Sequence, residues 1–193
     1  MNESSGDFTN EMSASITVSG TSENGIYNSS SSMLVNTTGA GIAISNANID
    51  GVANDGVFTN SDSAQVTVDS SGFDGFYMTS GSSLFNLNFA TITVSASFDE
   101  GIDNSGHVFN GSNSVVFIGN SNSDGIANNG TFTNTGNAQI TVDVSLYDGF
   151  YNTSAGTATN SNGAVFIAKS SDDDGIHNDG DFTNDSSASV III

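Results

Sequence analysis

The sequence of 193 residues contains no cysteine, no proline and no tryptophan, and small polar residues dominate it. Because it lacks cysteine, the chain can fold outside the cell without any oxidative step, which is compatible with secretion. A composition rich in Gly, Ser, Asn, Thr and Asp is often that of a disordered chain. Here, however, the apolar residues recur at fixed positions, which indicates an ordered repeat.

Basic residues are almost absent, since Lys169 is the single lysine or arginine against 21 acidic residues. The net charge of −20 excludes nucleic acid as a partner, because neutralising phosphates requires clustered Lys and Arg. An anionic membrane surface is excluded on the same grounds. No charged and apolar leader follows Met1, and no apolar run reaches the roughly 18 residues of a membrane span. We therefore expect no membrane insertion, and a secreted form would be a mature or excised segment.

A unit of 24 or 26 residues repeats along the whole chain, and it is clearest between Asp124 and Tyr147. Each unit is marked by a Gly that precedes a large apolar residue. A first unit, starting near Asn2, lacks this Gly but has the rest of the pattern. The chain 1–193 is thus predicted to be one repeat domain of eight units, the other seven starting at Gly25, Gly51, Gly75, Gly101, Gly125, Gly149 and Gly175.

Each unit contains three short segments in which apolar and polar residues alternate, as in strands with one buried face. In one unit these segments are 125–128, 132–134 and 138–142. The turns between them are too short for a crossover helix, so each coil must return over its own start and pair in parallel with the next. The prediction is an all-β, right-handed parallel β-helix (β-solenoid) of about eight coils, with three short strands per coil.

Asparagine ends the second strand of every unit. Stacked side chains of this kind can bond to identical side chains one coil up and down, and asparagine also tolerates the left-handed geometry of a tight corner. A second asparagine column stands three residues after each Gly, with Met78 as its one exception. We interpret the first column as a structural ladder of Asn10, Asn36, Asn60, Asn86, Asn110, Asn134, Asn160 and Asn184.

The pattern Asp-Gly-Ile-x-Asn-x-Gly-x-Phe-Thr-Asn-x-x-x-Ala-x-Ile-Thr-Val resembles the degenerate repeats of large bacterial cell-surface and secreted β-helix proteins. These include adhesin stalks and the passenger domains of autotransporters, and the resemblance covers the whole chain. It implies a parallel β-helix at the cell surface or outside the cell. It implies no particular ligand, because these families share an architecture while their ligands differ.

An acidic residue precedes most of the repeated glycines, at Asp50, Asp74, Glu100, Asp124, Asp148 and Asp174. Carboxylates stacked about 5 Å apart repel one another, so they require either turn N–H groups or a hard cation. Two interpretations stay open: each carboxylate caps its own corner, or the column binds calcium, although the Gly-Gly-x-Gly-x-Asp repeat of calcium-binding toxins is absent. The candidate calcium ligands are Asp124, Asp148, Asp172, Asp173 and Asp174, and no other cofactor is expected.

Tyr27, Tyr77 and Tyr151 stand at an outward position in the three units that carry two extra residues at one corner. Exposed rings at intervals of about 10 to 15 Å suit stacking on sugars or binding of a partner protein. The alternative is that each ring covers its own enlarged turn. These tyrosines are the candidate binding residues, and cell-surface glycans are their candidate ligand.

Other activities have weaker support. Ice binding requires Thr at regular outward positions, and residues such as Phe85 and Phe117 interrupt both Thr-bearing faces. Cleavage of an acidic polysaccharide could use two carboxylates about 5 Å apart, but any carboxylate column on a β-helix has that spacing. Lys169 alone could bind the substrate's acid groups, so we predict no enzyme activity. His107 and His177 fall on outward columns of different strands, and we expect both to be exposed and unpaired.

The apolar segment Val190–Ile193 leaves an unpaired sheet edge that can pair with another chain. Either the sequence is an excerpt of a longer solenoid, or the rods stack end to end into a fibre. The expected partners are therefore further coils of the same chain or other copies of it. We predict an extracellular structural or adhesive module; a glycan-binding or ice-binding β-helix is the alternative, and a polysaccharide-cleaving enzyme is less favoured.

Overall fold

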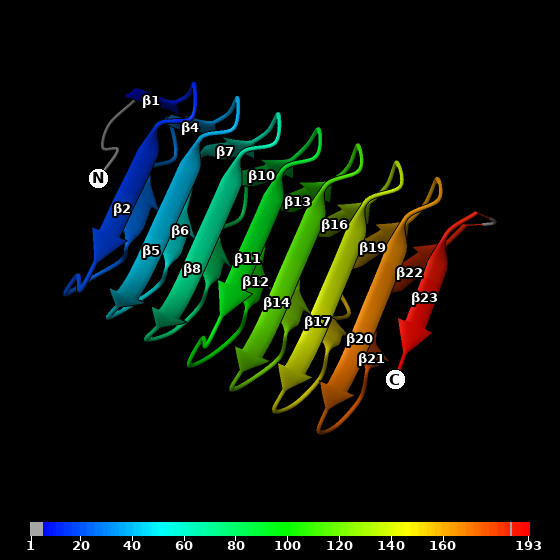
Figure 1. The fold of residues 1–193 in the computed structure, drawn as a ribbon. Helices are drawn as coiled ribbons and strands as arrows, with labels where there is room; N and C mark the ends of the chain where they lie inside the picture. The colour runs from blue at the N-terminus through cyan, green and yellow to red at the C-terminus, as the bar shows by residue number, and fades with distance from the viewer. Residues whose placement is uncertain (1–5, 186) are drawn as a thin grey trace.

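The computed structural model describes residues 6–185 and 187–193, and the regular structure among these residues is entirely β-strand. The predicted start of the first coil near Asn2 lies outside the described residues. The chain passes through three parallel sheets in turn and then repeats the circuit (Figure 1). The predicted β-solenoid of about eight coils with three strands per coil is confirmed. The described residues form no helix that could span a membrane.

The three sheets are named here after their first strands. The β1 sheet consists of β1 (Asp7–Asn10), β4 (Met33–Asn36), β7 (Val57–Asn60), β10 (Ser83–Asn86), β13 (His107–Asn110), β16 (Thr131–Asn134), β19 (Thr157–Asn160) and β22 (Asp181–Asn184). The β2 sheet consists of β2 (Ser15–Ser19), β5 (Gly41–Ala47), β8 (Gln65–Ser71), β11 (Thr91–Ser95), β14 (Val115–Ser121), β17 (Gln139–Ser145), β20 (Val165–Ser171) and β23 (Ser189–Ile192). The β3 sheet consists of β3 (Ile26–Asn28), β6 (Val52–Asn54), β9 (Phe76–Met78), β12 (Ile102–Asn104), β15 (Ile126–Asn128), β18 (Phe150–Asn152) and β21 (Ile176–Asn178).

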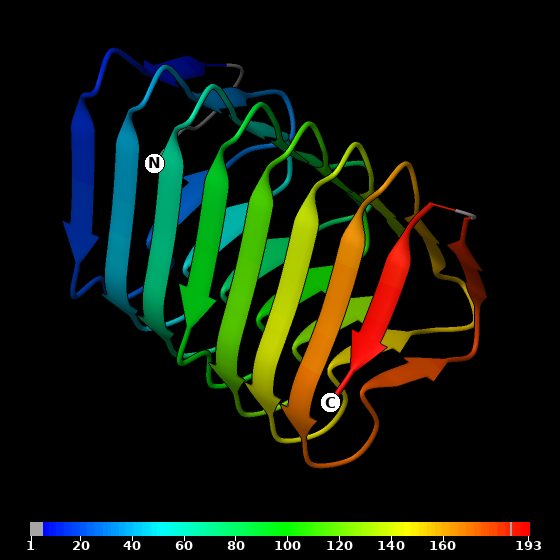
Figure 2. The same ribbon diagram turned by 45° about the vertical axis from the view of Figure 1, so that its right-hand side comes forward.

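The solenoid is right-handed, as the rule for parallel crossovers predicts. In Figure 1 the strands of the β2 sheet face the viewer and run downward, while successive coils are added from left to right. Figure 2 shows the other two sheets behind the β2 sheet, so that the three sheets enclose a common interior. Strand pairing places equivalent positions over one another; Asn86, for example, pairs with both Asn60 and Asn110.

Side chains that point inward at alternate strand positions fill the interior. In β11, Ile92 and Val94 are buried, while the threonines beside them lie on the outer face. Aromatic rings pack between sheets; Phe58 and Phe76 stack with their centroids 5.9 Å apart. One coil buries only a few such side chains, which is too little to offset the entropy of ordering about 24 residues. The stack is therefore the stable unit.

The repeated glycine is required by close packing between coils. A Cβ atom added at Gly101 would lie 2.6 Å from the carbonyl oxygen of Gly125 in the next coil and would overlap the side chain of Ile118. The next glycine's carbonyl and an inward side chain of the β2 sheet crowd Gly25, Gly51 and Gly75 in the same way. The glycine column therefore lets the chain pass close beneath the β2 sheet.

The corner between the β1 and β2 sheets contains two consecutive residues with positive φ. In the first described coil these are Met12, with φ 55°, and Ser13, with φ 61°. The amide of Ala14 donates to the carbonyl oxygen of Glu11 at 3.1 Å, so the corner is a type I′ turn. The ladder asparagines are not among the described residues with positive φ. The expectation that they adopt left-handed geometry is wrong, because the left-handed residues come two and three positions later.

The corner between the β3 and β1 sheets accounts for the two coil lengths. Four residues connect β3 to β4, whereas two connect β6 to β7. The strands on both sides of this corner keep the same register in spite of the difference. The extra residues seen in three units of the sequence therefore lie together at this one corner.

Candidate functional site

The asparagines that end the strands of the β1 sheet form an unbroken hydrogen-bonded ladder. Nδ2 of Asn86 donates to Oδ1 of Asn110 at 2.8 Å and to the carbonyl oxygen of Val115 at 3.0 Å. Asn86 is only 1% exposed, so these bonds are shielded from water. The predicted ladder is confirmed, with one bond between each successive pair of Asn10, Asn36, Asn60, Asn86, Asn110, Asn134, Asn160 and Asn184.

The second ladder, in the β3 sheet, is interrupted once. Asn28 donates to Asn54 at 2.7 Å, and Asn104 donates to Asn128 at 2.7 Å. Between them the buried Met78 takes the asparagine position, with its Sδ atom 3.6 Å from Nδ2 of Asn54. Because a thioether is a weak acceptor, the exception found in the sequence weakens the ladder at this coil.

The acidic column binds backbone amides across the coils. Oδ1 of Asp74 accepts the amide hydrogen of Glu100 at 3.1 Å, and the amide of Asp74 donates to Oδ1 of Asp50 at 3.3 Å. Asn24 plays the same part at the start of the column, where its Oδ1 accepts the amide hydrogen of Asp50 at 3.1 Å. In these bonds each side chain caps the corner of the next coil, whereas one of the two interpretations had each carboxylate capping its own corner.

Burial makes several of these carboxyl groups weak acids. Desolvation, followed by a hydrogen bond with the side-chain carboxyl group of Glu100 and repulsion from its charge, raises the pKa of Asp74 to about 9. Desolvation is also the main cause that raises the pKa of Asp124, in the column, and of Asp103, which pairs with Tyr77 outside the column, to about 6. At neutral pH Asp74 therefore keeps its proton, and the acidic column is not a continuous line of negative charge.

Two groups of potential metal ligands occur among the described residues, each with one ligand atom per residue and all three atoms within 4.8 Å of one another. The first group consists of Asp74, Asp99 and Glu100 and is purely acidic. Its buried member, Asp74, keeps a proton at neutral pH, which lowers the group's negative charge. The second group consists of Asp148, Asp174 and His177 and combines two carboxylates with an imidazole.

The fold brings only some of the five predicted calcium ligands close to one another. Asp148 and Asp174 share the second group, and the amide of Asp174 donates to Oδ1 of Asp148 at 3.0 Å. Asp124 lies one coil earlier in the same column and accepts the amide hydrogen of Asp148 at 2.9 Å. Asp172 and Asp173 are exposed and belong to neither group. Calcium binding by the column stays a prediction.

His177 belongs to the cluster although the sequence analysis missed it, and the expectation that it is unpaired is wrong. Its Nδ1 atom lies 3.2 Å from Oδ2 of Asp148, and its Nε2 atom lies 3.6 Å from Oδ1 of Asp179. The imidazole packs against the ring of Tyr151, with the centroids 5.0 Å apart. The repeat alignment contained the signal, because His177 stands directly over Tyr151 and three residues after an acidic column member, Asp174.

The three predicted tyrosines share one outward column of the β3 sheet. Tyr77 is 39% exposed, and the other two rings are partly buried. The hydroxyl of Tyr27 donates to Oδ2 of Asp55 at 2.6 Å, and that of Tyr151 donates to Oδ2 of Asp179 at 3.4 Å. Both acceptors lie in the next coil, so these two rings connect neighbouring coils, and Tyr77 has the most open ring.

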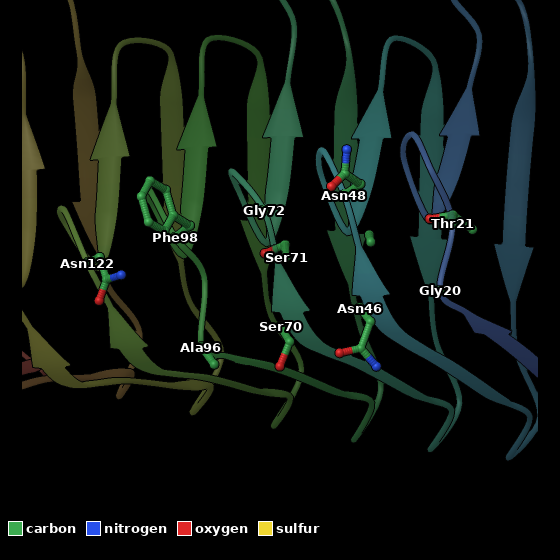
Figure 3. Close-up of a pocket in the computed structure, with 11 residues that line it drawn as sticks. Gly20, Thr21, Asn46, Asn48, Ser70, Ser71, Gly72, Ala96, Phe98 and Asn122 are labelled. Atoms are coloured by element: carbon green, nitrogen blue, oxygen red, sulfur yellow. The ribbon is translucent and has the colours of Figure 1, made fainter.

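A groove of about 600 Å³ runs along the corner between the β2 and β3 sheets (Figure 3). Gly72 leaves space between Asn48 and Phe98, which hold the equivalent position in the coils on either side. The Phe98 ring is 68% exposed, and none of the described residues that line the groove is charged. The sequence analysis missed this groove, and its signal was an aromatic residue, Phe98, flanked by Gly72 and Asn122 at the equivalent position of the neighbouring coils.

The outward threonines do not form a continuous face. Thr67 and Thr93 are neighbours in the β2 sheet, but Phe117 follows them in the same column. In the β1 sheet, Phe85 interrupts the threonine column, and the ring of His107 packs 5.8 Å from it. Ice binding, which requires an uninterrupted face, gains no support from this arrangement.

The described residues thus present three surface features that could support a function, namely the cluster at His177, the tyrosine column and the groove beside Phe98. Each is built from residues of several coils, so each depends on the register of the ladder. Comparison with known proteins identifies no family for the chain. No protein-family model, no curated protein and no solved structure matches the chain.

Proposed function

We propose that this chain is a structural module, a rigid extracellular stalk or fibre segment that displays a repetitive surface. The observation that carries the proposal is the unbroken ladder between Asn10 and Asn184. Each internal amide bonds to its neighbours and to the backbone of the next coil. Bending the rod at any coil would leave buried donors or acceptors unpaired, which is costly in a shielded interior.

The surface charge supports a soluble rod. Lys169 is the only lysine or arginine, and its Nζ atom lies 3.9 Å from Oδ2 of Asp143, so most of the negative charge is not neutralised. Like-charged rods repel one another along their sides, which disfavours lateral aggregation. The resemblance to adhesin stalks and autotransporter passenger domains is our reason for proposing a location outside the cell. Protease treatment of intact cells tests it, and a protein that stays uncut until the cells are lysed would contradict a surface location.

Limited proteolysis tests the ladder as the source of rigidity. Asn110→Ala removes a central member of the ladder, and Asn122→Ala removes an exposed asparagine from the same coil as the matched control. We expect the parent chain and the control to resist proteolysis equally, and Asn110→Ala to be cut near the middle of the chain. Solution scattering should give a rod length of about 38 Å per chain, from eight coils at about 4.8 Å each. Equal resistance of both variants would contradict the proposal.

The partners proposed for the rod are further coils, either of the same chain or of a second copy. The strands of the terminal coils have a free edge, with β1, β2 and β3 at one end and β21, β22 and β23 at the other. Such edges can be extended by parallel pairing. Ile192, in β23, is 57% exposed and would be covered by an added coil. Light scattering should show assembly of the isolated chain that Ile192→Lys abolishes; a monomer at high concentration would exclude pairing between copies.

Glycan binding is a second candidate function, and the groove beside Phe98 favours it. An exposed ring can stack on the apolar face of a sugar, and the amides of Asn46, Asn48 and Asn122 can both donate to and accept from hydroxyl groups. The strongly negative chain disfavours acidic sugars, so we propose neutral saccharides as the ligand class.

A glycan array with variants tests this candidate. Phe98→Ala should lower the affinity for a bound neutral glycan about tenfold, if stacking contributes about 1.4 kcal/mol. Phe89→Ala, which removes another exposed ring at a different corner, should leave the affinity unchanged. Binding that is lost in Tyr77→Ala and kept in Phe98→Ala would place the site on the tyrosine column instead. An array without any bound glycan would refute both sites.

A further inference from the structure

The cluster at His177 has no part in the ladder or in the core. Asp148 and Asp174 are successive members of the acidic column, and His177 is the central residue of β21. The three residues bring one imidazole nitrogen and two carboxylate oxygens within 4.8 Å of one another. Nitrogen and carboxylate oxygen together are a ligand set typical of zinc, whereas calcium takes oxygen ligands only.

The spacing of two of these ligand atoms fits a zinc ion. Asp148 is 6% exposed, and its Oδ1 atom is held by the amide hydrogen of Asp174 at 3.0 Å. Its Oδ2 atom points at His177 and lies 3.2 Å from Nδ1. In a tetrahedral site with bonds of about 2.0 Å, neighbouring ligand atoms are about 3.3 Å apart. The observed pair therefore already has the separation that zinc requires.

Two further side chains lie against the other side of the imidazole ring. Oδ1 of Asp179 lies 3.6 Å from Nε2 of His177, and the hydroxyl of Tyr151 donates to Oδ2 of Asp179 at 3.4 Å. The Tyr151 ring packs on the imidazole. Histidines that bind metals commonly donate their other ring N–H to a carboxylate, which fixes the tautomer and the orientation of the ring. Asp179 and Tyr151 are placed to fix His177 with Nδ1 directed at Asp148.

We propose that each chain binds one Zn²⁺ ion through Nδ1 of His177 and one carboxylate oxygen each of Asp148 and Asp174. Asp179 positions the histidine, and water completes the coordination. Because Asp148 and Asp174 belong to successive coils, the ion fastens those coils together. An ion pair between protonated His177 and Asp148 is the alternative, and it differs because it needs no contribution from Asp174.

Titration of the full chain with ZnCl₂, followed by calorimetry, tests the proposal. We expect one site per chain, with the affinity at least tenfold lower in His177→Ala and in Asp174→Asn. Asp179→Asn should lower the affinity by about tenfold through loss of positioning. His107→Ala removes the other histidine and is the matched control, which should bind like the parent. Zn²⁺ should raise the melting temperature of the parent and not that of His177→Ala.

Several results would overturn the zinc site. These are the absence of zinc binding, binding that survives His177→Ala, and binding that Asp174→Asn leaves unchanged, which would reduce the cluster to a His–Asp pair. A parallel titration with CaCl₂ separates the two cations. Calcium that binds as tightly as zinc and ignores His177→Ala would assign the site to the acidic column alone. Circular dichroism of each variant shows that the fold is intact; His177 and Asp174 lie at the surface, so we expect it to be.

Discussion

Replacing Asp74 with asparagine should stabilise the protein at neutral pH and leave its stability at pH 4 unchanged. Asn keeps the acceptor that caps the next coil, as Asn24 shows by accepting the amide hydrogen of Asp50 at 3.1 Å. The substitution also removes a carboxyl group whose charged form is destabilised by burial. Asp74 is 7% exposed, so water screens this effect little.

The magnitude follows from proton binding. In the folded chain Asp74 has a pKa of about 9, while in the unfolded chain it ionises near 3.8. Between these two values the folded state holds a proton that the unfolded state has released. The free energy of unfolding therefore falls as the pH rises, by about 1.4 kcal/mol per pH unit for this one group. At pH 7 the free energy of unfolding of the parent chain is therefore lower than that of Asp74→Asn by on the order of 4 kcal/mol. This difference corresponds to about 10 °C in melting temperature.

Thermal melts of both proteins at pH values from 4 to 8 measure this difference directly. The two melting temperatures should coincide near pH 4 and diverge as the pH rises, with Asp74→Asn the more stable. Asp181→Asn, which neutralises an exposed carboxylate on β22, controls for the change in net charge. A constant difference across the pH range, or a variant that is less stable at pH 7, would show that Asp74 is not the buried acid inferred here.

Three further substitutions, in two experiments, test the packing. Asn128→Ala should destabilise the chain by about 1 kcal/mol more than Asn54→Ala in urea unfolding, because Asn54 donates to the weak acceptor Met78 whereas Asn128 donates to another asparagine at 2.7 Å; equal losses would mean that the ladder bonds contribute little. Phe89→Gly should raise the melting temperature by about 2–4 °C, since Phe89 is held at φ 64° with 66% of its surface exposed. A lower melting temperature would show that the ring makes a stabilising contact.

The architecture could be predicted because every coil repeats the same constraints. The columns at Asn110 and Gly101 recur at intervals that match one circuit of three sheets, so the register follows from alignment alone. Met78 was recognisable as the exception for the same reason.

The candidate sites could not be predicted to the same extent, because they join residues of different columns. The contact between His177 and Asp148 depends on how far the corner brings the β3 sheet toward the acidic column. Likewise, the sequence shows that Asp74 belongs to a column but not that its oxygen caps Glu100 in the next coil. The pKa of Asp74 follows from burial, which composition does not encode.

The corner between the β3 and β1 sheets has a practical consequence for engineering. It holds two residues after β6 and four after β3, and the register on both sides is identical. Foreign peptides can therefore be grafted there without disturbing the coils above and below. Occupying this corner in alternate coils would place epitopes in a row along the rod at about 10 Å intervals, a fixed valency that flexible linkers do not provide.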